Sequence, residues 1–415
     1  MTALDQQLPS WIGFGLEERF RAEGMENQSF KRNDDDNYLL NRWRFLMQIK
    51  PTSWLRFVGQ MQDARAWLQQ PPLQPPNTNR FDLKLAYAEF GDPERQWVSV
   101  RVGRQLINYN NTIIANSEWR DQGRSYDAVV TNFHVDRVHL GVFAASVVNP
   151  LDEGISHHQE GNNIYGMYGA IDNLIAKNSS FEPFVLWRVD SSVSVETAKK
   201  ATTGHESEQA YGIRWKGLAF DNFDYSIEGI REAGQDGTNP IQAWGTTDGI
   251  SYRFMPLLWK PRVFTQYDYA SGDKHPNDQV HGTFDTMYPT AHDRFGISDQ
   301  FGWQNIKAIR GGVTIEPHNR WTVTAQWLDF WLASATDALY NTSGGVIVRN
   351  TLGTAGNHIG NEADAYTWYE INRHVNLGFG FAHIFPGTFL SKMEKGPNFS
   401  YPYFALNFKD AGKTH

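Results

Sequence analysis

Regular alternation of apolar and polar residues recurs from one end of the chain to the other, and it constrains the fold more than any other sequence feature. Clear examples are residues 12–21, 39–50, 55–62, 211–216 and 321–331. Successive side chains of a β-strand point to opposite faces, so each of these segments reads as a strand with one apolar and one polar face. No segment sustains the i, i+3, i+4, i+7 spacing of an amphipathic helix over three turns. The sequence therefore predicts an all-β protein.

Apolar run lengths and composition limit the class of protein to which these strands can belong. No uninterrupted apolar run reaches about 18 residues, which excludes a helical membrane protein. Charged residues make up 20% of the chain, below the usual ~25%, while aromatic residues reach 14%. A chain that is polar on average yet rich in aromatics can still lie in a membrane as a β-barrel, whose strands alternate lipid-facing and lumen-facing residues.

The connections between strands alternate between short and long, and both kinds are crowded with Gly, Pro, Asn and Asp. Short turns are expected at 50–53, 91–95, 135–137, 219–222, 316–320 and 372–374. Long loops are expected at roughly 24–37, 68–80, 108–124, 149–162, 191–207, 232–241, 271–304, 333–362 and 385–397. This division is typical of a transmembrane antiparallel up-and-down barrel with short periplasmic turns and long extracellular loops. We expect about 18 strands of roughly ten residues each in a single domain covering residues 1–415, with both termini on the periplasmic side.

Soluble β-propellers and β-helices also have many short strands, but no motif recurs here at the ~40–50 residues of a propeller blade. Tryptophans near strand ends favour the barrel, because such rings form girdles at the two membrane interfaces. They are Trp11, Trp54, Trp97, Trp119, Trp187, Trp259, Trp303, Trp321 and Trp331. The last expected strand alternates around Phe404, Leu406 and Phe408, although seven further residues follow it, unlike the usual terminal aromatic of such barrels.

Charge and motifs narrow the function. Lys plus Arg number 38 against 46 Asp plus Glu, a net charge of −8, which argues against a nucleic-acid binder. The absence of cysteine removes disulfides, thiol catalysis and Cys-ligated metals. No G-x-S-x-G or phosphate-binding loop is present, and we expect neither catalysis nor a cofactor. The opening residues lack the basic and apolar regions of a signal peptide, so we interpret the chain as either cytosolic or a mature outer-membrane form, and the strand pattern favours the latter.

Four groups of motifs, in order, resemble the alginate export porin family. They are RVGRQ at 101–105 with WRD at 119–121 and YDAV at 126–129; YDYASGD at 267–273 with FDTMYPT at 284–290, His292 and Gly296; FWLA at 330–333 with DALY at 337–340; and GNEAD at 360–364 with FPGTF at 385–389. The resemblance implies a monomeric barrel of about 18 strands in the bacterial outer membrane that conducts an anionic polysaccharide or another acidic solute. The resemblance is also compatible with a periplasmic export partner.

Arginines on the polar strand faces give a physical reason for that class of solute. An Arg facing lipid at the membrane midplane would cost ~2–4 kcal/mol, so these side chains belong in the lumen. Guanidinium groups match carboxylates, and repeated weak contacts would let a uronate chain pass without being trapped. The expected conduit residues are Arg42, Arg44, Arg56, Arg101, Arg188, Arg214, Arg253 and Arg310, together with Arg104. The alternative is that they brace the wall by pairing with acidic residues on the same faces, namely Glu17, Glu182, Asp190, Asp268 and Glu316.

Arg104 differs from the other arginines, because its parity with Val98, Val100 and Val102 points it toward lipid. A bulge at Gly103 could turn it into the bore, since Gly inside a strand often marks one. The alternative is an Arg that extends to the lipid headgroups. Loop 271–304 is of a length that is usually functional or disordered. Its family-like stretch 284–289 indicates order, so we expect the loop to fold inward as a lid or constriction.

Other candidate sites are weaker. The run Asp34, Asp35 and Asp36 could hold Ca²⁺ but more simply forms a solvated loop. His157 with His158, and His134 with His139, lack a third ligand at a recognisable spacing, so no metal site is expected. Three other functions compete with the anionic export channel: a general or sugar-acid diffusion porin, an outer-membrane enzyme, and a barrel whose loops dock a partner.

Overall fold

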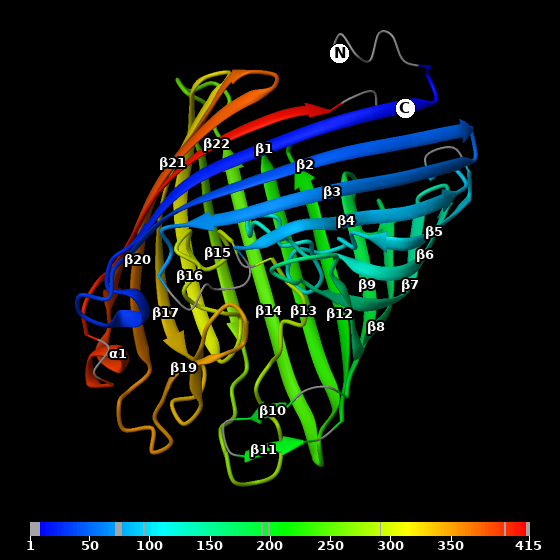
Figure 1. The fold of residues 1–415 in the computed structure, drawn as a ribbon. Helices are drawn as coiled ribbons and strands as arrows, with labels where there is room; N and C mark the ends of the chain where they lie inside the picture. The colour runs from blue at the N-terminus through cyan, green and yellow to red at the C-terminus, as the bar shows by residue number, and fades with distance from the viewer. Residues whose placement is uncertain are drawn as a thin grey trace.

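The computed structural model describes residues 9–70, 77–93, 96–191, 194–197, 200–203, 205–290, 292–393 and 396–411. Eighteen strands form one antiparallel sheet, and it closes into a barrel because β1 pairs with β22 as well as with β2 (Figure 1). Closure leaves no strand edge unpaired, which is what a lipid environment requires. The predicted fold class and the strand number are confirmed.

The first half of the wall consists of β1 (Ile12–Met25), β2 (Asp36–Thr52), β3 (Leu55–Trp67), β4 (Asn79–Phe90), β5 (Val98–Gln105), β6 (Tyr126–Val135), β7 (Val138–Asn149), β8 (His157–Asp172) and β9 (Ser179–Asp190). The second half consists of β12 (Glu206–Ala219), β13 (Phe223–Asp236), β14 (Asn239–Arg253), β15 (Arg262–Ala270), β16 (Ile306–His318), β17 (Trp321–Leu332), β20 (His358–Asn372), β21 (Val375–Pro386) and β22 (Phe399–Ala411).

Two short hairpins and two short helical segments lie in the connections. They are β10 (Ser194–Thr197) with β11 (Lys200–Thr203), β18 (Ala338–Tyr340) with β19 (Val346–Arg349), the 3-10 segment η1 (Gln28–Phe30), and α1 (Thr388–Lys392). None of the helical segments in the described ranges has the length and apolar character needed to cross a membrane.

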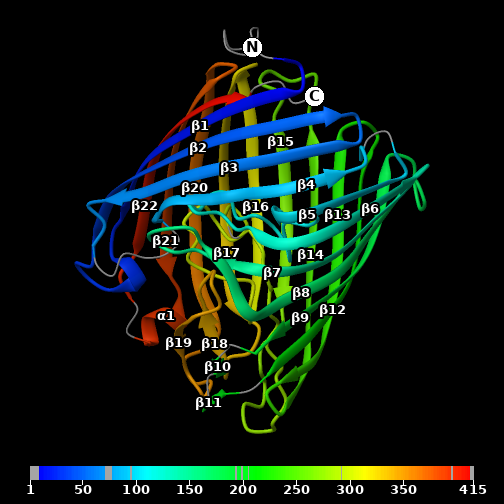
Figure 2. The same ribbon diagram turned by 45° about the vertical axis from the view of Figure 1, so that its right-hand side comes forward.

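The start of β1 and the end of β22 lie at the same rim of the barrel, at the top in Figures 1 and 2. Short turns such as 53–54, 136–137 and 319–320 lie at this rim, and the long connections lie at the other. One predicted long loop, 232–241, is wrong. The strands β13 and β14 continue to Asp236 and Asn239, which pair directly across the two residues Gly237 and Thr238. Gly237 is the first of the two turn residues and has a φ of 59°, and a glycine at this position favours a two-residue hairpin turn over a loop.

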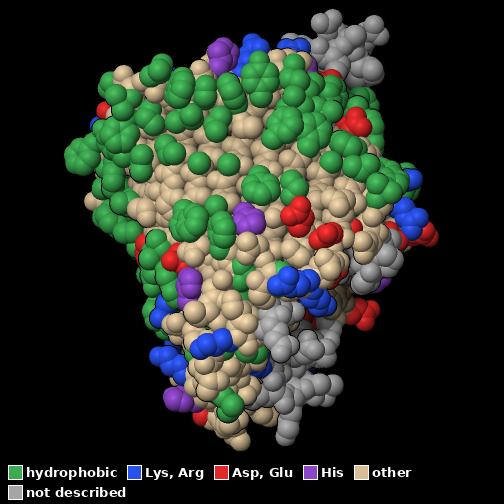
Figure 3. All heavy atoms as spheres, turned by 90° about the vertical axis from the view of Figure 1, so that its left-hand side faces the viewer, with side chains coloured by type: hydrophobic (Ala, Val, Ile, Leu, Met, Phe, Trp, Pro, Cys, Tyr) green, Lys and Arg blue, Asp and Glu red, His purple; other side chains and the backbone are tan. Residues whose placement is uncertain are grey.

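The wall has the two faces that the alternation predicts. On β2, for example, the outward Phe45 is 48% exposed, whereas the adjacent Arg44 points inward and is only 5% exposed. Hydrophobic side chains gather over the upper part of the face shown in Figure 3, toward the rim with the short turns. Exposed tryptophans lie near this rim, at Trp11, Trp54, Trp97, Trp259 and Trp321. Trp119 and Trp303 are exceptions to the predicted girdle, because both belong to loops inside the barrel.

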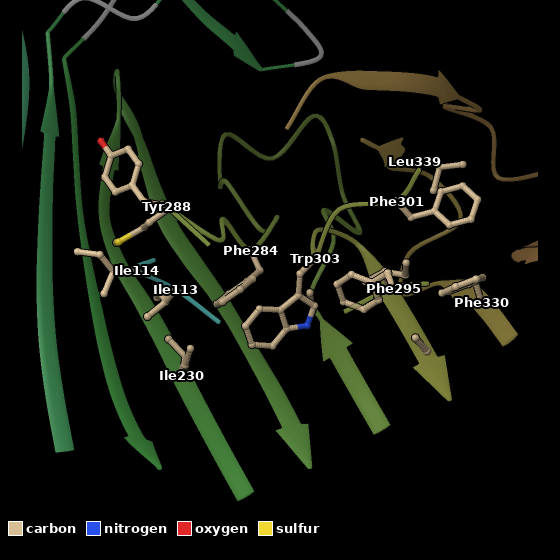
Figure 4. Close-up of a cluster of buried hydrophobic side chains, with 14 of the residues drawn as sticks. Ile113, Ile114, Ile230, Phe284, Tyr288, Phe295, Phe301, Trp303, Phe330 and Leu339 are labelled. Carbon is tan, nitrogen blue, oxygen red and sulfur yellow. The ribbon is translucent and has the colours of Figure 1, made fainter. Parts of the chain in front are cut away.

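The lumen is largely filled by two long connections, 106–125 between β5 and β6 and 271–305 between β15 and β16. Their backbones pair with each other: the Ala115 N–H donates to the Tyr288 carbonyl at 2.8 Å, and the Tyr288 N–H donates to the Ile113 carbonyl at 2.9 Å. Around this contact lies a buried apolar cluster that also includes Phe284 and Trp303, which pack edge to face (Figure 4). The prediction that loop 271–304 folds inward is therefore confirmed.

Candidate functional site: the conduit through the barrel

Four cavities follow one another through the barrel, and neighbouring cavities share lining residues. The turn-side cavity, about 810 Å³, begins at Asn173 and Asn178 near the rim with the short turns. It shares Arg214 and Asp293 with the first bore cavity, about 270 Å³. We call the chain of four cavities the conduit.

The conduit continues toward the rim with the long loops. The first bore cavity shares Asn111, Thr290 and His292 with the second bore cavity, about 470 Å³. The mouth cavity, about 490 Å³, shares Trp119 with the second bore cavity. The mouth cavity also reaches residues 28–31 and 341–343, which belong to the connections at the long-loop rim. The four cavities thus lie in series between the two rims of the barrel, and shared lining residues stand between each cavity and the next.

Basic side chains outnumber acidic ones along this route. Among the described residues, nine basic ones line the four cavities: Arg19, Arg21, Lys31, Arg120, Arg214, Lys216, Arg262, Arg294 and Arg310. Seven acidic residues of the same described ranges line them: Glu23, Glu118, Asp172, Asp224, Glu228, Asp293 and Asp299. The described linings thus contain a small excess of basic side chains, although the whole chain has a net charge of −8.

Loop 106–125 is held in place by basic side chains of the wall. Arg19 donates to the backbone carbonyls of Glu118 and Trp119, each at 2.8 Å, and binds the Asp121 carboxylate at 2.5 Å. Arg44 binds the Glu118 carboxylate at 2.5 Å. Burial raises the pKa of Glu118, but Arg44, with Lys84 and Arg42, outweighs it and holds that pKa at about 2. The pKa of Asp121 is likewise lowered, since Arg19 and Arg21 outweigh its burial.

Loop 271–305 is anchored on the other side of the bore, mainly through carboxylates of β20. The Glu362 side chain accepts hydrogen bonds from the Ser298 N–H at 3.1 Å and the Ser298 hydroxyl at 2.9 Å. The neighbouring Asp364 accepts from the Ile297 N–H at 3.2 Å. Arg294 binds Asp268 of β15 at 2.9 Å and lies 4.0 Å from the centre of the Trp303 ring. These contacts fix the loop across the lumen, so the conduit must pass beside it.

A carboxylate cluster joins the same loop to the wall. Glu206, Glu208 and Asp285 have oxygen atoms within 4.8 Å of one another, which is the spacing of metal ligands. The Arg188 guanidinium donates to all three carboxylates, through Nη2 to Glu208, through Nε and Nη2 to Glu206, and through Nη1 and Nη2 to Asp285. Despite its burial, the pKa of Asp285 is lowered, chiefly by Arg188. The arginine thus supplies the positive charge that a cation would otherwise provide.

The nine arginines predicted to line a conduit all have acidic partners. The pairs are Arg42 with Glu17, Arg44 with Glu118, Arg56 and Arg101 with Glu89, Arg104 with Asp127, Arg188 with Glu206, Glu208 and Asp285, Arg214 with Glu182, Arg253 with Glu316, and Arg310 with Asp293. Of the nine, Arg214 and Arg310 line the four cavities. Arg42 and Arg44 instead hold loop 106–125.

Arg104 does not follow the bulge predicted at Gly103. Gly103 has a φ of 118°, yet the register of β5 with both neighbouring strands continues unbroken through it. Arg104 therefore keeps the parity of the exposed Val102 and pairs with Asp127, which lies directly opposite on β6 at 2.8 Å. It also donates to the Ser156 carbonyl at 2.7 Å in the loop that follows β7. This arginine braces the outer face of the wall near the long-loop rim.

Comparison with known proteins decides the family. A family model described as alginate export matches residues 10–397. The chain belongs to the alginate export family. As a member, it is an outer-membrane channel, and the family is typically non-enzymatic. No match is found among curated proteins.

Solved structures show the same fold at low sequence identity. OccAB2 of Acinetobacter baumannii superposes with a TM-score of 0.65 at 9% identity, covering 97% of this chain and 99% of that one. OpdQ of Pseudomonas aeruginosa gives 0.64 at 9% identity, with coverages of 97% and 99%. OpdO of the same organism gives 0.62 at 11% identity, with coverages of 98% and 99%. These solved structures thus have the same barrel fold as this member of the alginate export family.

Several lining residues of the channel were not among the sequence candidates. Arg19 and Arg262 lie on strands. Arg19 alternates with the outward Phe20, so the parity rule used for the other arginines would have predicted that it faces the lumen. Trp119, His292 and Arg294 lie in loops, where strand parity gives no signal.

Of the weaker candidate metal ligands, Asp35 accepts a hydrogen bond from the Asn27 N–H and Asp36 accepts one from the Gln70 N–H. His134 stacks on His139.

Proposed function

We propose that this channel conducts an anionic polysaccharide, or another acidic solute, along the conduit. The observation that carries the proposal is the series of four cavities between the two rims, whose described linings contain more basic than acidic side chains. Arginines offer forked donors that suit carboxylates, and most of those in the linings, such as Arg214 and Arg310, already share their charge with an acidic neighbour. Shared charge keeps each contact with a solute weak, which favours passage over trapping.

Arg214 and Arg310 are the best-supported contacts for such a solute. Both line the turn-side cavity, and their acidic partners are held at moderate distances, 3.8 Å for Arg214 to Glu182 and 3.3 Å for Arg310 to Asp293. Arg310 also donates to the Asp293 backbone carbonyl, which fixes it beside the loop that narrows the bore. A carboxylated sugar entering this cavity would meet both guanidinium groups.

The test is ion selectivity and block in a planar bilayer. The wild-type channel should prefer anions in a salt gradient and should be blocked by oligouronates more strongly than by neutral oligosaccharides. Arg214→Glu with Arg310→Glu should weaken or invert the anion preference and reduce the block. Both effects should shrink at high salt, because the Debye length falls from ~10 Å at 0.1 M to ~3 Å at 1 M.

A matched control separates the bore from total charge. Arg65 and Arg80 are 52% and 43% exposed and pair with Asp63 and with Asp152 and Glu153. Arg65→Glu with Arg80→Glu therefore changes the net charge equally while leaving the conduit lining intact. Cation preference in the wild type, without oligouronate block, would contradict the proposal.

Diffusion of small acidic solutes such as sugar acids is the second candidate. It is favoured by the two loops that occupy the lumen, because they leave separate cavities of a few hundred Å³ each. Block by monomeric sugar acids with no additional effect of chain length would select this candidate over export of a polymer.

A further inference from the structure

Trp119 forms the partition between the mouth cavity and the rest of the conduit. Among the described residues, it is the one that lines both the mouth cavity and the second bore cavity. Arg21 lines the mouth side of this partition, and Arg19 and His292 line the bore side. A solute that moves between the two cavities must therefore pass the Trp119 ring.

His292 covers one face of that ring. The imidazole and the indole are stacked with their centroids 3.7 Å apart and their planes within 1° of parallel. His292 is held there by a 3.0 Å contact between its Nδ1 atom and the Asp299 carboxylate, and the edge of Tyr403 packs against Trp119 at 5.2 Å. The two stacked rings come from the two loops that fill the lumen, so the stack joins loop 106–125 to loop 271–305.

Two arginines surround the same ring. The guanidinium carbon of Arg21 lies 4.3 Å from the Trp119 ring centre, and that of Arg19 lies 6.0 Å away. Both arginines are buried and share Asp121 as a partner. The Nη1 atom of Arg21 and the Nε atom of Arg19 have no hydrogen-bond partner among the described residues. Buried donors without a partner are costly, so this position is suited to an additional acceptor.

We propose that His292 closes the conduit by occupying the Trp119 face, and that a carboxylated pyranose ring replaces it during passage. An indole presents a flat negative face to the C–H groups of a sugar ring, just as it does to the imidazole. A carboxylate on the sugar would then lie near Arg19, which lines the same cavity as His292 and whose Nε–H can donate a hydrogen bond to it. Because one ring face holds one partner, His292 and the sugar compete. The chemical class of the solute rests on the proposed function, but the closure by His292 does not.

The first experiment compares ring removal on the two sides of the stack. His292→Ala should raise the open-channel conductance and let an oligouronate block at lower concentration, because the indole face becomes free. Trp119→Ala should also raise the conductance but weaken the block about tenfold, the factor expected for losing one ring contact and its associated polar contacts. The opposite effects on block distinguish a binding face from a simple widening of the bore.

Conservative variants and a folding assay control for effects that come from loss of folding. His292→Phe keeps a flat ring and should behave as the wild type, and Trp119→Phe should retain part of the block. Each variant is first checked for a folded barrel by its shifted migration on a semi-native gel. If His292→Ala and Trp119→Ala leave both conductance and block unchanged while the wild type is anion-selective and blocked, the inference is overturned and the proposed function stands.

The same measurements also show whether the proposed function itself fails. A wild type that prefers cations and is not blocked by oligouronate overturns the proposed function, and the uronate subsite falls with it. In that case, a conductance increase in His292→Ala that is absent in His292→Phe would still support closure of the conduit by the stack.

Discussion

At the scale of single residues, Glu118 is a central anchor of loop 106–125. Arg44 binds its carboxylate at 2.5 Å, and Arg19 binds its backbone carbonyl at 2.8 Å. The folded-state pKa of Glu118, about 2, lies below its ordinary value of 4.5 because the nearby cations outweigh burial. A carboxylate with a lowered pKa contributes stability that is complete above its ordinary pKa and is lost as the pH falls toward the folded-state value.

We therefore predict that loss of the Glu118 anchor adds a rise in conductance between about pH 4.5 and pH 2. Glu118→Gln should show part of that rise already at pH 7, because the amide carries no charge for Arg44 to bind. Single-channel recording across the pH range checks both statements. Equal conductance of Glu118→Gln and wild type at pH 7 would show that the backbone contacts alone hold the loop.

At the scale of elements, the docking of loops onto the wall depends on small residues at the contact points. Tyr109 of loop 106–125 lies over Gly141 of β7, where a Cβ atom would overlap its ring. The same ring stacks on Phe143 at 5.7 Å and on Tyr168 at 5.2 Å, and its hydroxyl donates to Asn132 at 3.3 Å. The absence of a side chain at Gly141 thus decides where this loop packs.

We predict that Gly141→Val displaces Tyr109 and costs about 1–3 kcal/mol, the usual range for overpacking a filled interior. The measurement is the temperature at which the unboiled barrel converts to the unfolded form on a semi-native gel, which should fall, together with noisier open-channel current. Gly59→Val is the matched control, because Gly59 of β3 has no neighbouring atom within 4 Å of an added Cβ. A similar loss in both variants would mean that the β-strand itself, and not the loop contact, is disturbed.

At the scale of the whole molecule, closure of the sheet governs stability. Every wall strand is hydrogen-bonded on both sides, and the seam between β1 and β22 extends over nine paired positions, from Gly15 opposite Ala411 to Glu23 opposite Tyr403. In lipid or detergent, opening any strand would expose backbone groups that have no other partner. The barrel should therefore resist detergent as one cooperative unit.

We predict that the purified protein requires detergent and is heat-modifiable. Boiled and unboiled samples should migrate differently on a semi-native gel, because the closed barrel stays compact until heat unfolds it. A monodisperse species in buffer without detergent, or identical migration of the two samples, would contradict a membrane barrel.

The sequence by itself determined which segments form the barrel wall and which of their side chains point outward or inward. Alternation acts between neighbouring residues, so the parity of residues such as Phe45 and Arg44 reports the outer and inner faces without knowledge of any distant contact. Turn chemistry is also local, and most connections were predicted. The loop expected at 232–241 was wrong because Gly237 and Thr238 form a tight two-residue turn, and the glycine is a local signal that was read as part of a loop.

Only the tertiary structure decided the contents of the lumen. Trp119 reads as a girdle residue from its position near a strand, but it stacks on His292, which lies far along the chain in another loop. The contact of Arg120 with Thr342 spans 222 residues of sequence. Which arginines pair with wall carboxylates and which line the conduit depends on how two loops pack against each other and against the wall. No local pattern encodes these pairings, because their partners meet only after the barrel has closed.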